Sequence, residues 1–531
     1  MKKALRVFLI AAGLTVLLVV ARLTGSKGES RYNVILISMD TTRYDHVDTG
    51  RGARARTPRL KRFAQRATVL ENVYTVIPQT LPSHLSIFTG HYPHEFGVKG
   101  NEFQYDGRFE TLPQILRNHG YSTGGVISLG TLNTETGFNQ GFDHFVEDLF
   151  AAHRFYVPAE SVTRRGLELL DRLEPRPFFL FMHYSDPHTP YAPPDAHSPF
   201  TVSLDGEEIA AFNGHQGAIL RLEKRIGAGE HTLTLKVHRA QEEFSHFALR
   251  RLKLPDGAEA DFRGISYSPE LYGGSHRLDE PEGTVRFRQA RAGTLKLFQV
   301  IPILTKEAAI RHYRAEVEYM DRHIGHFLDR VARRGLMKDT VILLFADHGE
   351  GLGERDHYFG HVRHLNPQFI HIPAILHVPR RAPARIATPM STIGVTPTLL
   401  EILKIEHATV NPQLSWQRRI DHPERSPRLL SFAFGPSAEV DKFSVIRWPY
   451  QAIFISAPPR RLRNEFYNIG RYASFSRWDR ISYGVFIDRA KRCYYNFIRD
   501  RRRGNFYFKS HQTAAVADQD HREQLKSLGY L

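Results

Sequence analysis

The sequence predicts an α/β fold in which a mostly parallel sheet is sandwiched between helices. Short runs of apolar residues, typical of strands that are buried on both faces, alternate along the chain with helix-like segments. Carboxylate and imidazole side chains stand directly after several of these runs. Because ligands of such folds bind beyond the carboxyl ends of the strands, this arrangement also indicates where a functional site would lie.

The predicted strands of this sheet are residues 32–39, 121–128, 178–184, 340–346 and 372–378. Asp40 follows the first of them. Asp186 and His188 follow the third, and Asp347 and His348 follow the fourth. The clearest helix is predicted over residues 306–334, where apolar residues recur on one face until Gly335 ends the pattern.

Two stretches depart from this alternation. Residues 199–300 show period-two patterns and turn signals, which predict an inserted antiparallel β-sandwich of about 100 residues. It could bind carbohydrate or pack on the core. Residues 411–531 are rich in arginine and aromatic residues and are predicted to form a small C-terminal α+β subdomain. The core then consists of residues 31–198 and 301–410.

Residues 1–30 predict either a signal peptide or an N-terminal membrane anchor, because lysines precede an uncharged apolar run over residues 7–21. As a helix this run is about 22 Å long, which is short for a hydrocarbon layer of ~30 Å and suits a signal peptide. No small-x-small cleavage site follows directly, which suits an uncleaved anchor. The rest of the chain is expected on the periplasmic or extracellular side, anchored in the cytoplasmic membrane.

The composition favours a globular protein with an anionic partner. Hydrophobic residues make up 41% of the chain, which excludes general disorder, and the formal net charge is +16. No nucleic-acid-binding motif accompanies this charge, so nucleic acid is not the expected partner. The single cysteine, Cys493, excludes an internal disulfide and a thiolate metal cluster.

Thr80 is the central candidate residue. It stands two residues before Pro82, and the apolar run that follows ends at Gly90, which predicts a helix that starts beside Thr80. A helix N-terminus stabilises an anion, so the Thr80 hydroxyl could be a nucleophile that acts on an anionic substrate. The alternative is that Thr80 only caps the helix.

The residues that follow the predicted strands could form one site together with Thr80. Asp40, Asp347 and His348 could bind one divalent metal ion, with Thr80 as a further ligand and nucleophile. Basic or imidazole groups could neutralise the transferred group or protonate the leaving oxygen, and the candidates are His188, His361 and Lys99.

These motifs resemble the sulfatase family, within the alkaline phosphatase superfamily of metal-dependent ester hydrolases. The family's nucleophile motif is matched by Thr80-Leu-Pro82-Ser83-His84, with Thr89-Gly90 and Gly97 after it. Its metal-binding segments are matched by Asp40 and by Asp347-His348-Gly349-Glu350, and its substrate histidines by His188 and His361. The resemblance implies a fold of the alkaline phosphatase and sulfatase type and an ester hydrolase.

The chain departs from the family at the nucleophile. Sulfatases of the usual kind convert a cysteine or serine to formylglycine, whereas Thr80 cannot become an aldehyde and His84 replaces the arginine of that motif. No formylglycine is therefore expected, and Thr80 would attack as an alkoxide. His348 stands where asparagine is common, which favours Zn or Mn over Ca, although Ca is possible.

Three hypotheses follow for function. The first is an exported, metal-dependent hydrolase of sulfate or phosphate esters. The second is a membrane-anchored transferase of phosphoryl head groups, similar to phosphoethanolamine transferases, which would use the N-terminal segment as its membrane contact. The third is a catalytically inactive, sulfatase-like protein that binds a glycan. In each case the partner is an anionic ester on a glycan or a lipid head group.

Overall fold

The computed structural model describes residues 32–492, apart from residues 51, 148–156, 175–176, 190, 192, 194–198, 214–221, 239–243, 251, 257, 269–274, 298, 355–358, 363, 424–430, 436–440, 458–460, 470–472 and 475–489. The predicted signal or anchor over residues 1–30 lies outside the described residues. So do Cys493 and the end of the predicted C-terminal subdomain.

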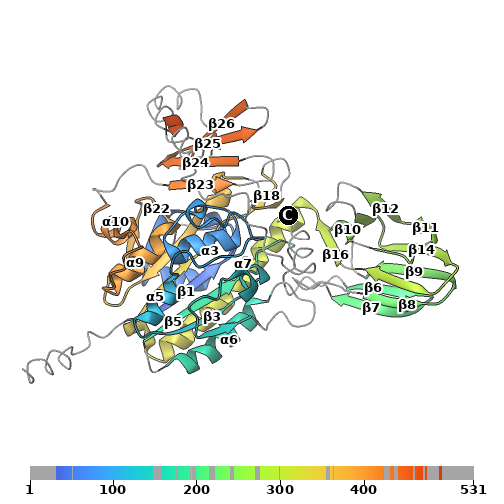
Figure 1. Cartoon of the computed structure of the whole chain (residues 1–531), viewed down its shortest axis with the longest axis horizontal. Coiled ribbons are helices and arrows are strands. Elements are labelled where there is room, and N and C mark those ends of the chain that lie inside the picture. Colours follow the sequence, from blue (N-terminus) through green and yellow to red (C-terminus); the bar gives the residue numbers. More distant parts are fainter. Residues whose placement is uncertain are drawn as a thin grey trace, which may run out of the picture.

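The body of the protein is built on a mixed, mainly parallel sheet with the strand order β21-β2-β20-β17-β1-β5-β3-β4 (Figure 1). Its centre is β1 (Asn33–Met39), which runs parallel to β17 (Thr340–Phe345) and to β5 (Phe178–Tyr184). Beyond β5 lie the parallel strands β3 (Ser122–Val126) and β4 (His144–Val146). This arrangement confirms the predicted fold class.

On the other side of the centre the strand directions change. β20 (His371–His377) is antiparallel both to β17 and to β2 (Thr68–Tyr74), and β2 is parallel to β21 (Ala384–Ile386) and β22 (Met390–Ser391). The sequence analysis does not predict β2, because Glu71 and Asn72 interrupt its apolar pattern. The register of β2 and β20 shifts at this point, between Leu70 and Val73.

Helices cover both faces because the side chains of β1 alternate between two cores. Val34 and Leu36 pack into the core beneath α3 (Thr80–Thr89), α5 (Leu112–Asn118) and α9 (Val395–Ile402). Ile35 and Ile37 pack into the core beneath α2 (Pro58–Ala64), α6 (Ala159–Leu173) and α7 (Lys306–Arg333). Short helices complete the body: α4 (Pro93–Phe96), α8 (Pro367–Ile370) and α10 (Gln417–Asp421). A strand buried on both faces needs a continuous apolar run, which is why this part of the sequence was informative.

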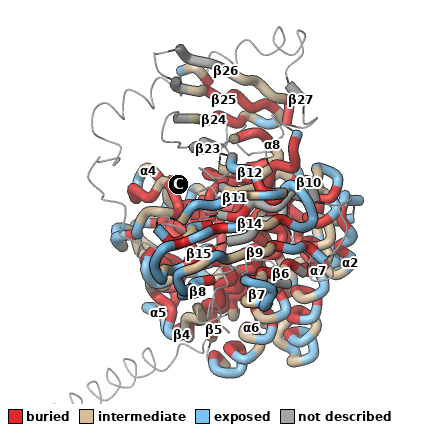
Figure 2. Tube along the Cα trace, turned by 90° about the vertical axis from the view of Figure 1, so that its right-hand side faces the viewer, coloured by how far each residue is buried: buried red, intermediate tan, exposed pale blue. Residues whose placement is uncertain are grey.

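The stretch from Pro199 to Leu304, called the insert below, is antiparallel throughout its described pairings. One sheet has the order β11-β14-β9-β6-β7, another β12-β13-β10-β16, and β15 pairs with β8. Buried and more exposed positions alternate along β14 and along the second half of β9 (Figure 2). The strands are β6 (Pro199–Leu204), β7 (Glu207–Asn213), β8 (Leu222–Ile226), β9 (Gly229–Val237), β10 (Phe244–Arg250), β11 (Glu259–Arg263), β12 (Ile265–Ser268), β13 (Ser275–Leu278), β14 (Glu282–Gln289), β15 (Gly293–Leu297) and β16 (Gln299–Leu304).

A further antiparallel sheet follows α10 in the chain and lies above the body in Figure 1. It has the order β23 (Ser431–Gly435), β24 (Asp441–Arg447), β25 (Tyr450–Ala457), β26 (Arg461–Asn468) and β27 (Ala473–Ser474). Ile446 and Ile453 of this sheet pack against Tyr74, Phe369 and Ile370 of the body. The exact domain boundaries proposed from the sequence stay predictions.

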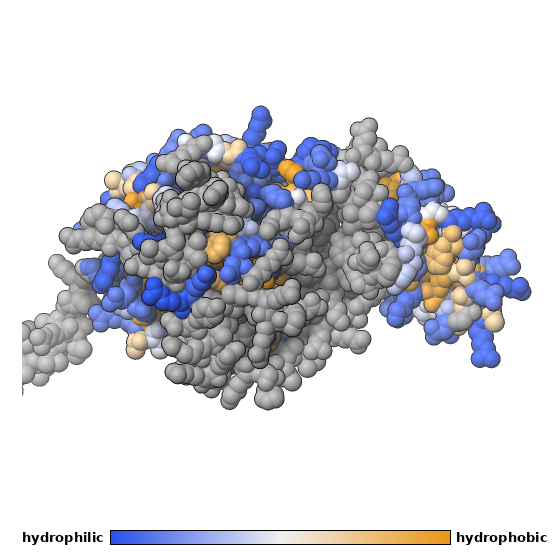
Figure 3. Space-filling view, turned by 90° about the horizontal axis from the view of Figure 1, so that it is seen from above, coloured by the Kyte–Doolittle hydropathy of each residue, from blue (hydrophilic) through white to orange (hydrophobic). Residues whose placement is uncertain are grey.

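Seen from above, much of the described surface is hydrophilic, and the clearest apolar area lies on the insert, at the right of the view (Figure 3). Within the described ranges, no helix combines the length and the apolar character needed to cross a bilayer.

One buried carboxylate fastens α2 to α7 and allows a test of the fold. Asp321 accepts hydrogen bonds from the backbone N–H groups of Leu60 and Arg59, at 2.8 and 3.1 Å. Replacing it, as Asp321→Ala, would leave these donors without their partner and is expected to lower the free energy of unfolding by about 1–3 kcal/mol. Urea denaturation measures this change.

The matched control is Asp329→Ala on the same helix. Asp329 is half-buried and contacts the side chain of Arg59 at 3.2 Å in a partly solvated ion pair, so its loss is expected to cost less than about 1 kcal/mol. Equal destabilisation by the two substitutions would contradict the role assigned to Asp321.

Candidate metal and nucleophile site

The parallel strands β1 and β17 end side by side, and each delivers a carboxylate to the same point. Asp40 follows β1, while Asp347 and His348 follow β17 after Ala346. All three side chains are fully buried. His348 Nε2 lies 3.5 Å from Asp40 Oδ1 and 3.3 Å from Asp347 Oδ2. The structure thus brings together three of the four predicted metal ligands.

The atoms that face one another in this cluster are all acceptors. Both carboxylate oxygens of Asp40 and the Oδ2 of Asp347 have no hydrogen-bond partner among the described residues. The Nδ1 of His348 lies 3.0 Å from the carbonyl oxygen of Gly349, so Nδ1 carries the proton and Nε2 presents a lone pair. Burial raises the pKa of Asp40 to about 8, and burial together with the charge of Asp40 raises the pKa of Asp347 well above its usual value.

A divalent cation fits this donor set. One ligand atom from each of the three residues lies within 4.8 Å of the others. Two ligands at about 2.1 Å from a tetrahedral ion are about 3.4 Å apart, close to the spacings around His348 Nε2. Buried lone pairs that face one another without a proton are unfavourable unless a cation lies between them. Two carboxylates and an imidazole are ligands that suit Zn and Mn.

Thr80 is placed beside this cluster by the start of α3. Its Oγ1 lies 3.5 Å from His348 Nε2. The helix begins at Thr80 itself, one position earlier than predicted, and Gln79 is its N-cap without a side-chain capping bond. Thr80 therefore does not act as the N-cap. Ser83 ties the same helix to β17, because its hydroxyl donates to the carbonyl oxygen of Asp347 at 2.9 Å.

His84, which replaces the motif's arginine, holds the first turn of α3 in position. Its Nδ1 donates to the carbonyl oxygen of Thr80 at 2.7 Å, and its Nε2 lies 2.8 Å from the hydroxyl of Ser38 on β1. The His84 ring is fully buried, and burial lowers its pKa well below the usual value, so the ring is neutral. His84 thus links Thr80 to the sheet without adding charge.

Thr41 has an unusual backbone conformation for a β-branched residue, with φ of 55°. Its backbone N–H donates to Asp347 Oδ1 at 3.3 Å, and its carbonyl oxygen accepts a hydrogen bond from the hydroxyl of Tyr313 at 2.8 Å. The Thr41 hydroxyl lies 2.9 Å from the carbonyl oxygen of Pro187, away from the acceptor cluster. Such strain is typical of functional sites, and here it turns the chain directly after Asp40.

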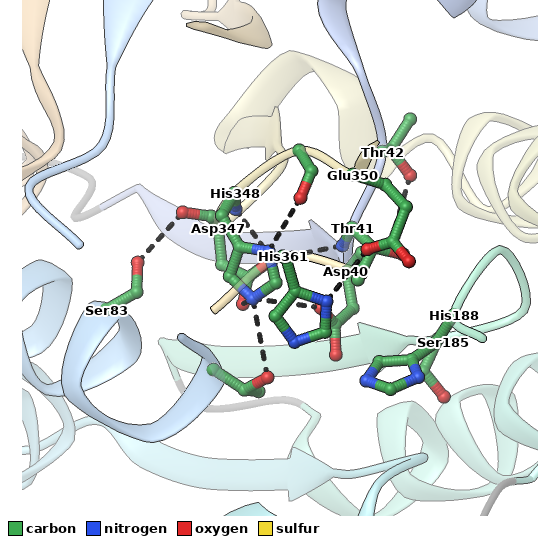
Figure 4. A network of polar contacts seen from close by, with 12 residues as sticks. Asp40, Thr41, Thr42, Ser83, Ser185, His188, Asp347, His348, Glu350 and His361 are labelled. Atoms are coloured by element: carbon green, nitrogen blue, oxygen red, sulfur yellow. Dashed lines mark hydrogen bonds and ion pairs between the residues drawn. The ribbon is translucent and has the colours of Figure 1, made fainter. Parts of the chain in front are cut away.

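The two predicted substrate histidines lie together next to the cluster (Figure 4). The ring centre of His361 is 4.4 Å from that of His348 and 4.9 Å from that of His188. The Nδ1 of His188 lies 2.7 Å from the carbonyl oxygen of Thr189 and therefore carries a proton. Burial lowers the pKa of His361 to about 3 and that of His188 well below its usual value.

Lys99, the remaining candidate, is half-buried, with its ammonium 5.7 Å from the centre of the Phe103 ring. Its role at the site stays a prediction.

Two further residues at the site carry no clear sequence signal. Asn101 accepts a hydrogen bond from the N–H of Leu81 in the first turn of α3, at 2.8 Å. His183 lies 3.4 Å from Asp40 Oδ2. A polar residue near the end of a strand buried on both faces could have identified His183, whereas Asn101 stands in a loop without a recognisable pattern.

Comparisons with known proteins agree with this geometry. The family model "Sulfatase" matches residues 32–405. The N-acetylglucosamine-6-O-sulfatase of Bacteroides thetaiotaomicron is 25% identical over 404 residues, which are 71% of this chain and 68% of that protein. A solved structure in complex with its substrate D-glucosamine-2-N,6-O-disulfate has a TM-score of 0.60 at 14% identity, and the match covers 92% of this chain and 100% of that one.

A phosphonate monoester hydrolase from Silicibacter pomeroyi has a TM-score of 0.57 at 16% identity, covering 90% of this chain and 96% of that one. At such identities the structural likeness establishes the fold, whereas the family model spans both halves of the body and every motif of the site. This chain therefore belongs to the sulfatase family and is a sulfatase-like ester hydrolase, as its motifs predict.

Proposed function

We propose that this chain hydrolyses a sulfate ester on a carbohydrate, with the hydroxyl of Thr80 as the nucleophile. The observation that carries the proposal is the position of that hydroxyl, which lies in the first turn of a helix and 3.5 Å from His348 Nε2 in the buried acceptor cluster. A helix N-terminus favours the negative charge that develops on the nucleophile and on the ester.

The reaction takes place in two displacements at sulfur. In the first, the bond between Thr80 Oγ1 and sulfur forms, the bond between sulfur and the ester oxygen breaks, and the hydroxyl proton of Thr80 passes to water. The leaving oxygen keeps the electron pair and takes a proton from a neighbouring imidazole, for which His361 is our candidate. In the second, water attacks sulfur, Thr80 regains its proton and sulfate leaves.

Asp40, Asp347 and His348 would hold a divalent cation, with Thr80 as the fourth protein ligand. When bound, this cation supplies the positive charge that lowers the pKa of the Thr80 hydroxyl and offsets the charge of the ester. The residues themselves orient Thr80, because His84 fixes its carbonyl oxygen and Ser83 fixes the helix on Asp347. We propose Zn or Mn as the ion.

The carbohydrate substrate and the location are further parts of the proposal. The N-acetylglucosamine-6-O-sulfatase supports a sulfated sugar, as does the neighbour that binds glucosamine disulfate. The net charge of +16 suits an anionic glycan. From the apolar segment in residues 1–30 we propose that the chain acts on the periplasmic or extracellular side of the membrane.

Thr80→Ala is expected to reduce turnover by on the order of 10³-fold or more, because it removes the attacking oxygen. Thr80→Ser keeps that oxygen and should retain most of the activity. The measurement compares 6-O-sulfated N-acetylglucosamine, 4-nitrophenyl sulfate, 4-nitrophenyl phosphate and bis(4-nitrophenyl) phosphate.

Ser86→Ala is the matched control, because Ser86 lies on the same helix and its hydroxyl only donates to the carbonyl oxygen of Pro82. Undiminished activity of Thr80→Ala would exclude the nucleophile role. If the protein cleaves only phosphate esters, a sulfate ester is the wrong substrate class. If its activity requires a lipid acceptor, the chain acts as a transferase of phosphoryl head groups.

Cation binding can be tested without turnover. Excess Zn or Mn should raise the melting temperature of the wild-type protein, because a ligand at 100 times its Kd adds about 2.7 kcal/mol of stability. Asp40→Asn should lose most of this increase, while the cation-free variant should be about as stable as the wild type, because burial raises the pKa of Asp40 to about 8 and its cation-free carboxyl group is mostly neutral at pH 7. Calorimetry and metal analysis measure both effects.

The control here is Asp186→Asn. Asp186 is buried at the end of β5 and accepts the N–H of Ala159, but it is not part of the three-residue cluster. A cation effect that survives Asp40→Asn unchanged would mean that the ion binds elsewhere.

A further inference from the structure

Glu350 is a fully buried carboxyl group that the mechanism above does not use. It lies in the loop after β17, two residues beyond His348. The hydroxyl of Tyr191 donates to its Oε1 at 2.9 Å. The Nδ1 of His361 lies 2.8 Å from its Oε2 (Figure 4). Each carboxyl oxygen therefore has its own side-chain partner, one of which is a candidate for the chemical step.

His361 differs in this respect from its neighbours. The Nδ1 atoms of His348 and His188 face backbone carbonyl oxygens, which fix the proton on Nδ1 whatever side chains surround them. The Nδ1 of His361 faces a side chain instead. The orientation of this ring therefore depends on Glu350. In Figure 4 the opposite edge of the His361 ring points away from Glu350.

Glu350 is itself held from two sides. Its carbonyl oxygen accepts a hydrogen bond from Nη1 of Arg43 at 3.3 Å, and the same guanidinium forms two bonds of 2.9 Å with Asp45. On the other side, the Tyr191 ring packs edge-on against Tyr313, with ring centres 5.5 Å apart. A buried carboxyl group fixed in this way can hold an imidazole in one orientation.

We propose that Glu350 is a positioning residue for His361, and that Tyr191 fixes Glu350 for this task. The inference rests on the proposed function, in which His361 acts on the leaving oxygen. When the anionic ester binds, the His361 ring takes a second proton from water, so that both of its nitrogens carry one. As the bond between sulfur and that oxygen breaks, the proton on Nε2 moves to the oxygen, and the neutral ring keeps its proton on Nδ1, facing Glu350. The water of the second displacement returns a proton to Nε2.

The decisive experiment compares two leaving groups in the variants E350Q and Y191F. A sugar alkoxide needs a proton to leave, whereas 4-nitrophenolate leaves readily without one. E350Q should lower kcat for the sugar sulfate by on the order of 10²-fold, with a much smaller loss for 4-nitrophenyl sulfate and little change in KM. Y191F should show the same pattern with a smaller loss.

E354Q is the matched control, because Glu354 is a nearby carboxylate in the same loop that pairs with Arg43 and accepts the N–H of Leu352. It should leave the ratio between the two substrates unchanged. Melting temperature and cation content show whether each variant is folded.

A double-variant cycle separates positioning from a structural role. H361N and E350Q/H361N should be equally impaired, because Glu350 has nothing to orient once the imidazole is absent. Additive losses would overturn the inference, as would equal losses on both leaving groups. Loss of activity in H361N with normal activity in E350Q would also refute it, while leaving the proposed function intact.

A readout without turnover keeps the test independent of the substrate. In protein labelled with ¹⁵N at histidine, E350Q should change the ring nitrogen signals of His361, and E354Q should not. Unchanged His361 signals in E350Q would overturn the inference even if no ester were cleaved. Undiminished activity of Thr80→Ala would instead contradict the proposed function.

Discussion

The site depends on one electrostatic constraint, which is the burial of several lone pairs at a single point. Asp40 and Asp347 follow adjacent parallel strands, so the sheet itself fixes their distance and they cannot move apart. The ring proton of His348 lies on Nδ1 and faces the carbonyl oxygen of Gly349, so its Nε2 is another acceptor at the same point. Because the sheet prevents relaxation, a cation is the simplest way to offset this repulsion.

The described histidines beside the cluster, His84 and His183, add hydrogen bonds rather than charge, because burial lowers the pKa of each ring. Where the family motif has an arginine, His84 is neutral and holds the backbone of Thr80. An arginine would bring a permanent positive charge next to a cation site. A neutral imidazole avoids that repulsion and still anchors the helix to Ser38 on β1. The two departures from the family motif, Thr80 and His84, are therefore both compatible with a cation at this site.

The sequence predicts the parts of the site that follow from strand order. β1, β5 and β17 are buried on both faces, so their apolar runs were recognisable, and their carboxyl ends placed Asp40, Asp347 and His188 at one edge. The contact between Glu350 and His361 was not predictable, because it depends on how two loops fold against each other. β2 was not predicted for a related reason. Its polar residues Glu71 and Asn72 lie at the register shift between β2 and β20, which the sequence alone does not reveal.

The insert joins the body close to the edge of the sheet that carries the site. The chain leaves for β6 shortly after Tyr191 and returns from β16 through Thr305 into α7. Both joining segments carry a tyrosine that reaches the site: Tyr191 contacts Glu350, and Tyr313 of α7 contacts Thr41. A stretch inserted between β5 and α7 leaves every strand of the sheet in place. Its sequence can therefore vary without moving the acceptor cluster.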